Sequence, residues 1–225
     1  YIGVRTLIKA EYSGAIGELF FNLNRLFAAL LAFLYLTEVM KEKLSSSRLR
    51  NIGTTLNLSK MNKVAVGSLC TLFLAVPFFC STPLNLSSEH RGLMLVGSLI
   101  VGVHEELIYR VLLLKYTQKY LGFWGSLGFS SVCFTLFHLG FVPTEWINYV
   151  EIGVASVFLG LVYSYTRSFM LIVFLHTMYD TLWLFESVDV GEGGMLNFGV
   201  YLLFLSLIAS LLLLRPFKVF EVKAG

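Results

Sequence analysis

The chain has 225 residues, of which 56% are hydrophobic and 14% charged, and its formal net charge is +3. Soluble domains carry roughly 25% charged residues, so the composition excludes an ordinary soluble protein and predicts a membrane protein. The basic excess does not indicate a nucleic-acid partner, because loop lysines and arginines set the orientation of a polytopic protein in its bilayer.

Seven apolar runs approach the roughly 20 residues that a helix needs to cross a hydrocarbon core about 30 Å thick. In chain order they cover residues 19–40, 64–80, 93–114, 122–142, 146–165, 169–185 and 195–214. The first run is the least regular, because Asn22, Asn24 and Arg25 lie near its start. We predict an all-α fold, a polytopic transmembrane helical bundle of about seven spans in a single membrane domain over residues 1–225.

The basic residues of the loops alternate between the two sides of this bundle. Twelve lysines and arginines lie in segments 41–63, 115–121, 166–168 and 215–225. Only three lie in the alternate segments, which are 1–18, 81–92, 143–145 and 186–194. Because basic residues concentrate in cytoplasmic loops, the N-terminus is predicted outside and the C-terminus in the cytoplasm. We therefore expect a multi-pass integral membrane protein, which in a prokaryote would lie in the cell membrane.

The third run contains three charged residues, Glu105, Glu106 and Arg110. Each ionisable group costs at least about 2.5 kcal/mol in hydrocarbon, so three in one helix indicate a functional site. Glu106 and Arg110 are four residues apart and share a helix face, so they are predicted to pair. Glu105 then points to a different face and is available for chemistry. A structural ion pair alone would explain Glu106 but not Glu105.

Two later runs repeat the four-residue spacing, with Phe134 before His138 and His176 before Asp180. The Asp180 carboxylate is expected to orient the His176 ring, as acidic groups commonly do around functional imidazoles. Phe134 is expected to support the His138 rotamer by packing. Glu151, near the start of the fifth run, is interpreted as a marker of the outer interface.

The depth of these groups follows from the rise of 1.5 Å per residue. Glu106 and His176 each lie nine residues from a basic residue of a cytoplasmic loop, so both are expected roughly 14 Å below that face. His138 fits the same depth only if residues 116–125 run along the interface and the span starts near Gly125. The glycines at 122 and 125 permit that bend.

Two imidazoles, a paired glutamate and an unpaired glutamate in one polar cavity suit hydrolysis inside a membrane. A carboxylate can take a proton from water while the histidines stabilise the oxyanion. Alternatively, His138 and His176 with Glu105 or Glu106 supply three zinc ligands and leave a fourth position open. The sequence does not decide between these two mechanisms.

At these residues the chain resembles the CAAX protease and bacteriocin-processing (CPBP, or Abi) family of intramembrane endopeptidases. The resemblance rests on E-E-x-x-x-R at 105–110, F-x-x-x-H at 134–138 and H-x-x-x-D at 176–180, and covers about residues 93–185. It implies a glutamate-dependent endopeptidase that cuts a membrane-anchored or lipidated peptide or protein near the face of the lipid bilayer. Asp180 departs from the asparagine that is common in the family.

The resemblance also implies roles for the residues of the three motifs. Glu105 would activate water, and Glu106 with Arg110 would shape the site. His138 with Asp180 would stabilise the oxyanion, and His176 would support the water or the glutamate. No tightly bound cofactor is expected, although zinc stays open. Two alternatives remain, a proton-coupled transporter that uses these groups as a relay, and a catalytically idle family member that confers immunity or binds a partner.

Overall fold

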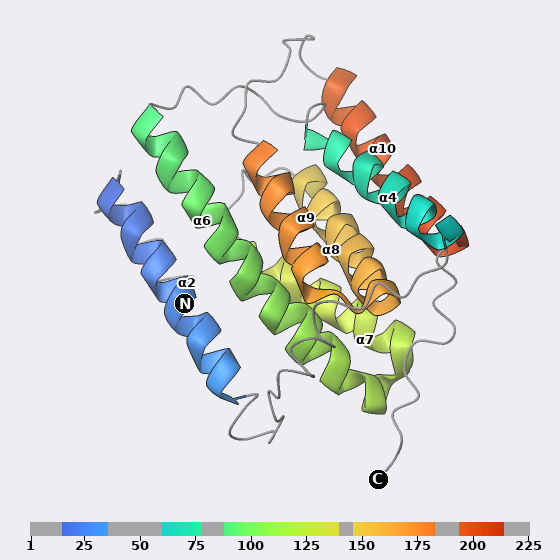
Figure 1. The fold of residues 1–225 in the computed structure, drawn as a ribbon, viewed down its shortest axis with the longest axis horizontal. Helices are drawn as coiled ribbons and strands as arrows, with labels where there is room; N and C mark the ends of the chain where they lie inside the picture. Colours follow the sequence, from blue (N-terminus) through green and yellow to red (C-terminus); the bar gives the residue numbers. More distant parts are fainter. Residues whose placement is uncertain (1–14, 36–59, 78–87, 140–145, 183–193, 214–225) are drawn as a thin grey trace.

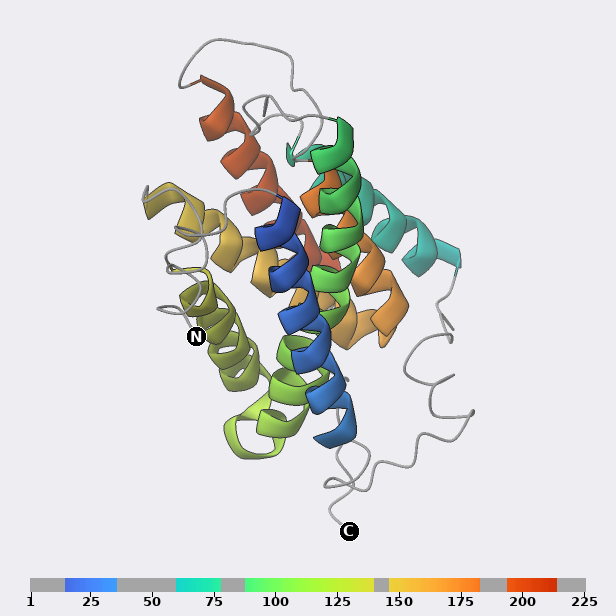
Figure 2. The same ribbon diagram turned by 90° about the vertical axis from the view of Figure 1, so that its left-hand side faces the viewer.

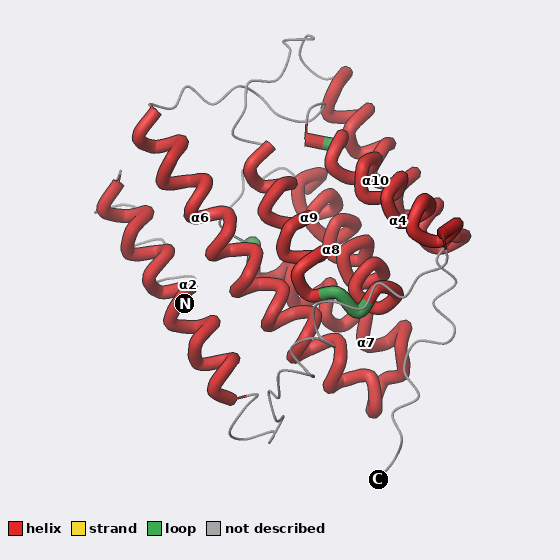
Figure 3. The backbone as a smooth tube through the Cα atoms, in the orientation of Figure 1, coloured by secondary structure: helices red, strands yellow, loops and turns green. Residues whose placement is uncertain are grey.

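The computed structural model describes residues 15–35, 60–77, 88–139, 146–182 and 194–213. The described residues are nearly all helical, and none of them forms a strand, as Figure 3 shows. The prediction of an all-α fold is therefore confirmed for these residues.

The helical elements overlap the predicted apolar runs, and the third run corresponds to two consecutive elements. They are α2 (Ala15–Leu34), α4 (Lys60–Ala75), α6 (Ser88–Glu106), η2 (Leu107–Leu114), α7 (Lys115–Phe137), α8 (Trp146–Thr166), α9 (Phe169–Leu182) and α10 (Gly194–Leu213). The predicted run ends at 36–40, 78–80, 140–142 and 183–185 lie outside the described residues.

The helices α6, α9 and α8 form the middle of the bundle (Figure 1). On one side, α2 runs beside α6, which is visible again in the view turned by 90° (Figure 2). On the other side, α10 packs against α8 and α4, and α4 also contacts α9. The helix α7 follows η2 in the chain and packs against η2 and α8. The motif-bearing elements α6, η2, α7 and α9 are thus neighbours.

The element after the two glutamates is a π-helix, η2, which continues α6 without a break. Such segments are rare and occur frequently at functional sites. The Ser130 hydroxyl of α7 donates a hydrogen bond of 2.7 Å to the Tyr109 carbonyl of η2. This bond ties the irregular segment to its neighbour and satisfies a backbone acceptor that is buried in the bundle.

The helix α7 is bent at Gly122, where φ is +65° and ψ is 179°. Glycine adopts this conformation at no steric cost, whereas a side chain would strain it. The bend divides α7 into a short first segment and a second segment that ends at Phe137 beside His138. A break of the helix was predicted in this region from the depth of His138, and the structure has it at Gly122.

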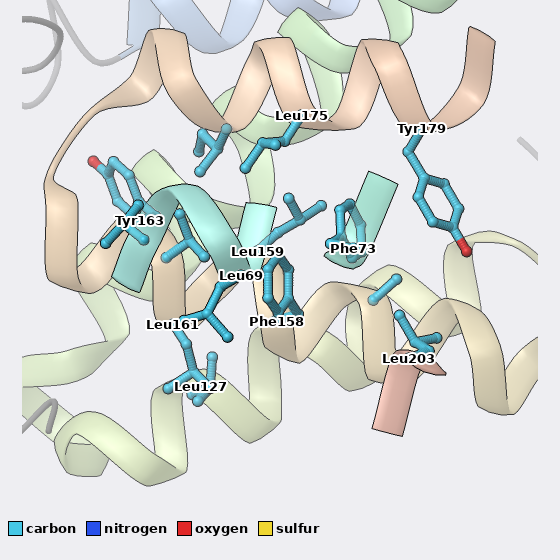
Figure 4. Packing of buried hydrophobic residues seen from close by; sticks show 14 of the residues in the cluster. Leu69, Phe73, Leu127, Phe158, Leu159, Leu161, Tyr163, Leu175, Tyr179 and Leu203 are labelled. Carbon is cyan, nitrogen blue, oxygen red and sulfur yellow. The ribbon is translucent and has the colours of Figure 1, made fainter. Parts of the chain in front are cut away.

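The apolar core lies between α4, α8 and α9, with contributions from α7 and α10. Figure 4 shows Leu69 and Phe73 of α4 against Phe158 and Leu159 of α8, with Leu175 of α9 on the other side. All five of these side chains are buried. This packing fixes α9 relative to α8 and therefore the position of the residues that α9 carries.

Length and composition identify one helical stretch in the described residues, Tyr149–Thr166 of α8, that is long and apolar enough to cross a membrane. Four further apolar helical stretches are shorter than this criterion: Asn22–Leu34, Val64–Ala75, Phe169–Leu182 and Leu202–Leu211. The seven spans and their orientation therefore stay predictions.

Candidate active site

Glu106 is fully buried and contacts two of the other motif residues. Its Oε2 lies 3.1 Å from Arg110 Nε, which is the ion pair that the four-residue spacing predicts. Its Oε1 accepts a hydrogen bond of 2.7 Å from His176 Nδ1 on α9. One carboxylate therefore links the end of α6 both to η2 and to α9.

Glu105, one residue earlier, points towards the two histidines. Its side chain is 1% exposed, and Oε2 lies 3.6 Å from His138 Nε2 and 3.8 Å from His176 Nε2. Both distances are too long for direct hydrogen bonds, but a small polar group can bridge atoms at such separations. The two adjacent glutamates thus face different partners, as expected from the helix geometry.

Both imidazoles are held through Nδ1 and turn Nε2 towards Glu105. The His138 Nδ1 donates to the Phe134 carbonyl over 2.8 Å, because a carbonyl oxygen can only accept. The His176 Nδ1 donates to the Glu106 carboxylate. Since each Nδ1 carries a proton, Nε2 of a neutral ring is an acceptor, and it becomes a donor only in the imidazolium.

The Phe134 ring lies among the other motif side chains. Its centroid is 4.6 Å from that of His138 and 5.9 Å from that of His176. The Arg110 guanidinium carbon lies 4.8 Å from the same centroid, within the range of a cation–π contact. Phe134 therefore supports His138 through both its ring and its carbonyl, and it also contacts Arg110.

Asp180 lies at the accessible edge of this group, with a side chain that is 33% exposed. Its Oδ2 is 3.6 Å from His176 Nε2, so it contacts the nitrogen that faces Glu105. The sequence led us to expect that Asp180 orients His176. The structure differs, because the ring is held by the short hydrogen bond that His176 Nδ1 donates to Glu106 on another helix.

A small cavity of about 70 Å³ adjoins these residues. This volume has room for a few water molecules. Its walls come from α4, α7, α8 and α9 and consist of Phe73, Phe134, His138, Glu151, Ile152, Ala155, Leu159, His176, Tyr179 and Asp180. The motif histidines and Asp180 therefore face a common space inside the bundle.

Glu151 is the residue that sequence reasoning misjudged. It does not mark an outer interface, because it is 5% exposed and lines the cavity. The Tyr179 hydroxyl donates a hydrogen bond of 2.5 Å to Glu151 Oε1. The signal that could have found it is the one that singled out Glu105, a carboxylate inside an apolar run.

The zinc alternative requires three donor side chains that face a common point. No group of three or more His, Cys, Asp or Glu side chains in the part of the chain that the structure describes is arranged to hold a metal ion. Both oxygens of Glu106 already face Arg110 and His176. Of the two carboxylates considered as a third ligand, only Glu105 faces Nε2 of both histidines.

The family described as type II CAAX prenyl endopeptidase Rce1-like matches part of the chain. The match covers residues 88–182, from the start of α6 to the end of α9. No curated protein and no solved structure matches the chain. The matched segment contains all three motifs together with Glu151. This match supports the assignment of residues 88–182 to the CAAX protease family, whose members are membrane proteins and proteases.

Proposed function

We propose that the protein is an intramembrane endopeptidase that hydrolyses a peptide bond of a membrane-anchored or lipidated peptide or protein. One observation carries this proposal. The buried Glu105 carboxylate lies 3.6 and 3.8 Å from Nε2 of two histidines that are held on separate helices. These three groups come from α6, α7 and α9 and meet beside a cavity.

In this proposal a water molecule occupies the space between Glu105 and the two imidazoles. Glu105 takes a proton from the water as the oxygen attacks the scissile carbonyl carbon, which is general-base catalysis. His176 Nε2 forms a hydrogen bond with the water, as acceptor when the ring is neutral and as donor when it is an imidazolium. Glu106 keeps the His176 ring in place. The proton later passes to the nitrogen of the leaving amine, so that the products are a carboxylic acid and an amine.

His138 and Asp180 face the cavity, where the carbonyl oxygen of the substrate develops negative charge. Because the Nδ1 proton of His138 is bound to the Phe134 carbonyl, His138 can donate to this oxyanion only as an imidazolium. Asp180 can donate only as a carboxylic acid, since a carboxylate has no proton to give. Preorganised donors of this kind lower the barrier of acyl transfer.

The surface of the described helices supports a substrate that arrives from the bilayer. Large apolar side chains that are more than half exposed include Leu23 and Phe27 of α2, Val96 of α6, and Met170 and Phe174 of α9. Apolar exposure on this scale marks a surface that contacts lipid or a partner. We therefore propose a multi-pass membrane position, with the site reached by peptides that are themselves held at the membrane.

The test uses the purified full chain in liposomes with fluorescein-labelled peptides that carry a farnesyl group, a geranylgeranyl group, a transmembrane anchor or no anchor. We expect cleavage of anchored peptides, with product masses that identify the bond, and no loss of activity with a chelator. Proton-driven flux without cleavage would favour the transporter. A folded protein that shows neither cleavage nor flux would favour the catalytically idle family member.

A further inference from the structure

The cavity has two chemically different walls. His138, His176 and Asp180 lie on the wall where the proposed reaction takes place. A second part of the wall, built by α4 and α8, consists of the apolar side chains Phe73, Ile152, Ala155 and Leu159. Glu151 is the ionisable residue that α8 adds to this wall, and the proposed mechanism does not use it.

The position of the Glu151 carboxylate is fixed by Tyr179 of α9. The tyrosine hydroxyl donates to Oε1, and the tyrosine ring stacks on Phe73 with centroids 4.6 Å apart. Phe73 in turn stacks on Phe158 at 4.4 Å. Figure 4 shows this row of rings, with Tyr179 reaching from α9 towards α8. The stack keeps the hydroxyl, and therefore the carboxylate, in one place.

Glu151 has acceptor capacity that the described residues leave unused. A carboxylate accepts about four hydrogen bonds through its two oxygens, and Tyr179 supplies one. Within the described ranges, no lysine, arginine or histidine forms an ion pair with Glu151. A buried carboxylate that lacks such partners is costly unless a further donor is bound.

A peptide that places one of its residues against the cavity supplies such a donor. Its main-chain N–H groups leave water and must be satisfied inside the site, because an unpaired buried amide is costly. The four apolar residues of this wall have no side-chain acceptor, whereas Glu151 does. The apolar side chains can at the same time contact an apolar side chain of the substrate.

We infer that Glu151, held by Tyr179, is a substrate-binding residue that accepts a hydrogen bond from a main-chain N–H of the peptide beside an apolar subsite. The inference rests on the proposed function for the identity of the ligand. It gives the protein a determinant of substrate binding on α8, separate from the groups that act on water and on the oxyanion.

The test measures peptide binding by fluorescence anisotropy to the full chain that carries Glu105→Gln, so that no cleavage occurs. Each main-chain amide of the bound peptide is N-methylated in turn. We expect one position at which N-methylation raises Kd about 10- to 100-fold, as for loss of a hydrogen bond to a charged acceptor. Adding Glu151→Leu raises Kd of the unmodified peptide by the same factor, and N-methylation at that position then has no further effect.

Glu151→Gln provides a second, more conservative variant in case the leucine variant does not fold. It keeps one acceptor oxygen without the charge, so Kd is expected to rise about threefold to tenfold and the N-methylation penalty to shrink. Ser156→Ala is the matched control, because Ser156 is buried in α8 and does not line the cavity. It leaves the N-methylation profile unchanged.

The inference would be overturned if the rises in Kd from Glu151 substitution and from N-methylation multiplied at every position of the peptide. It would also be overturned if N-methylation raised Kd of the Glu151→Gln variant as much as that of the protein with Glu151, or if no peptide bound. Failure of the proposed function has a different signature. In that case the unmodified protein cleaves none of the peptides, while those that bind still depend on Glu151.

Discussion

His176 Nδ1 and Glu106 Oε1 lie 2.7 Å apart and form a buried hydrogen bond between residues that are 70 positions apart in the sequence. The bond joins α9 to the end of α6 and sets which nitrogen of His176 faces Glu105. Because the same carboxylate also pairs with Arg110, the first motif positions the third. The adjacent glutamates thus have different roles. Glu106 positions Arg110 and His176, and Glu105 faces the cavity-lining histidines.

Replacing Arg110 by methionine should destabilise the protein by about 3 to 5 kcal/mol, because it removes one partner of a buried ion pair. Chemical unfolding in mixed micelles measures this loss. The double variant Glu106→Gln, Arg110→Met removes both charges and should recover much of it. Equal stability of the single and double variants would contradict a buried charge pair.

His138 is predicted to act as a donor through Nε2. His138→Ala should lower kcat by about 100- to 1000-fold, the loss typical of one oxyanion donor. His138→Gln carries an amide N–H₂ near the position of Nε2, so it should lose markedly less. Rates on one anchored peptide measure both variants, and equal losses would argue against the donor role.

Asp180 offers a direct test of whether a donor or a negative charge is needed near His176. Asp180→Asn supplies an N–H₂ group at any pH and is expected to keep activity within about tenfold of the unmodified protein. Asp180→Ala removes the group and should reduce kcat about 100-fold. An asparagine variant as inactive as the alanine variant would mean that the carboxylate charge itself is required.

Gly102 allows α6 and α9 to approach closely next to the site. A Cβ at this position would lie 2.6 Å from Thr177 Oγ1 and 3.3 Å from the Val173 carbonyl oxygen. Gly102→Ala should therefore push the helices apart, weaken the Glu106 to His176 bond and lower kcat, since a misplacement of about 1 Å can cost 100-fold.

The control for this variant is Gly128→Ala in α7, where the added Cβ has no neighbour within 4 Å apart from the adjacent residues and the backbone of its own helix. It should keep full activity and be slightly more stable, because alanine favours a helix over glycine. Thr177→Ala removes the nearer obstacle and should partly rescue Gly102→Ala. Full activity of Gly102→Ala would contradict the tight packing of α6 on α9.

Much of the site could be predicted from local spacing. The pairing of Glu106 with Arg110 and the support of His138 by Phe134 both follow from residues four apart on one helix. A mismatch in depth predicted a bend at Gly122 or Gly125 with the span starting near Gly125, and the structure has the bend at Gly122. These features depend on helix geometry alone, which the sequence encodes directly.

Contacts between helices could not be predicted in the same way. The partner of His176 Nδ1 is Glu106, not Asp180, because the approach of α9 to α6 decides it. The position of Glu151 in the cavity could not be predicted either, since it depends on the packing of α8 on α9. The π-helical geometry of η2 was also not predicted, as its apolar pattern differs little from that of an α-helix.

The central claim is that Glu105 activates the attacking water, and single-turnover cleavage by Glu105→Gln tests it most directly. Glutamine has the same shape but cannot take a proton, so the rate on the anchored peptide cleaved fastest by the unmodified protein should fall about 100- to 10,000-fold. Peptide affinity and the unfolding midpoint should stay close to their original values. A folded Glu105→Gln protein that cleaves within tenfold of the original rate would contradict the account.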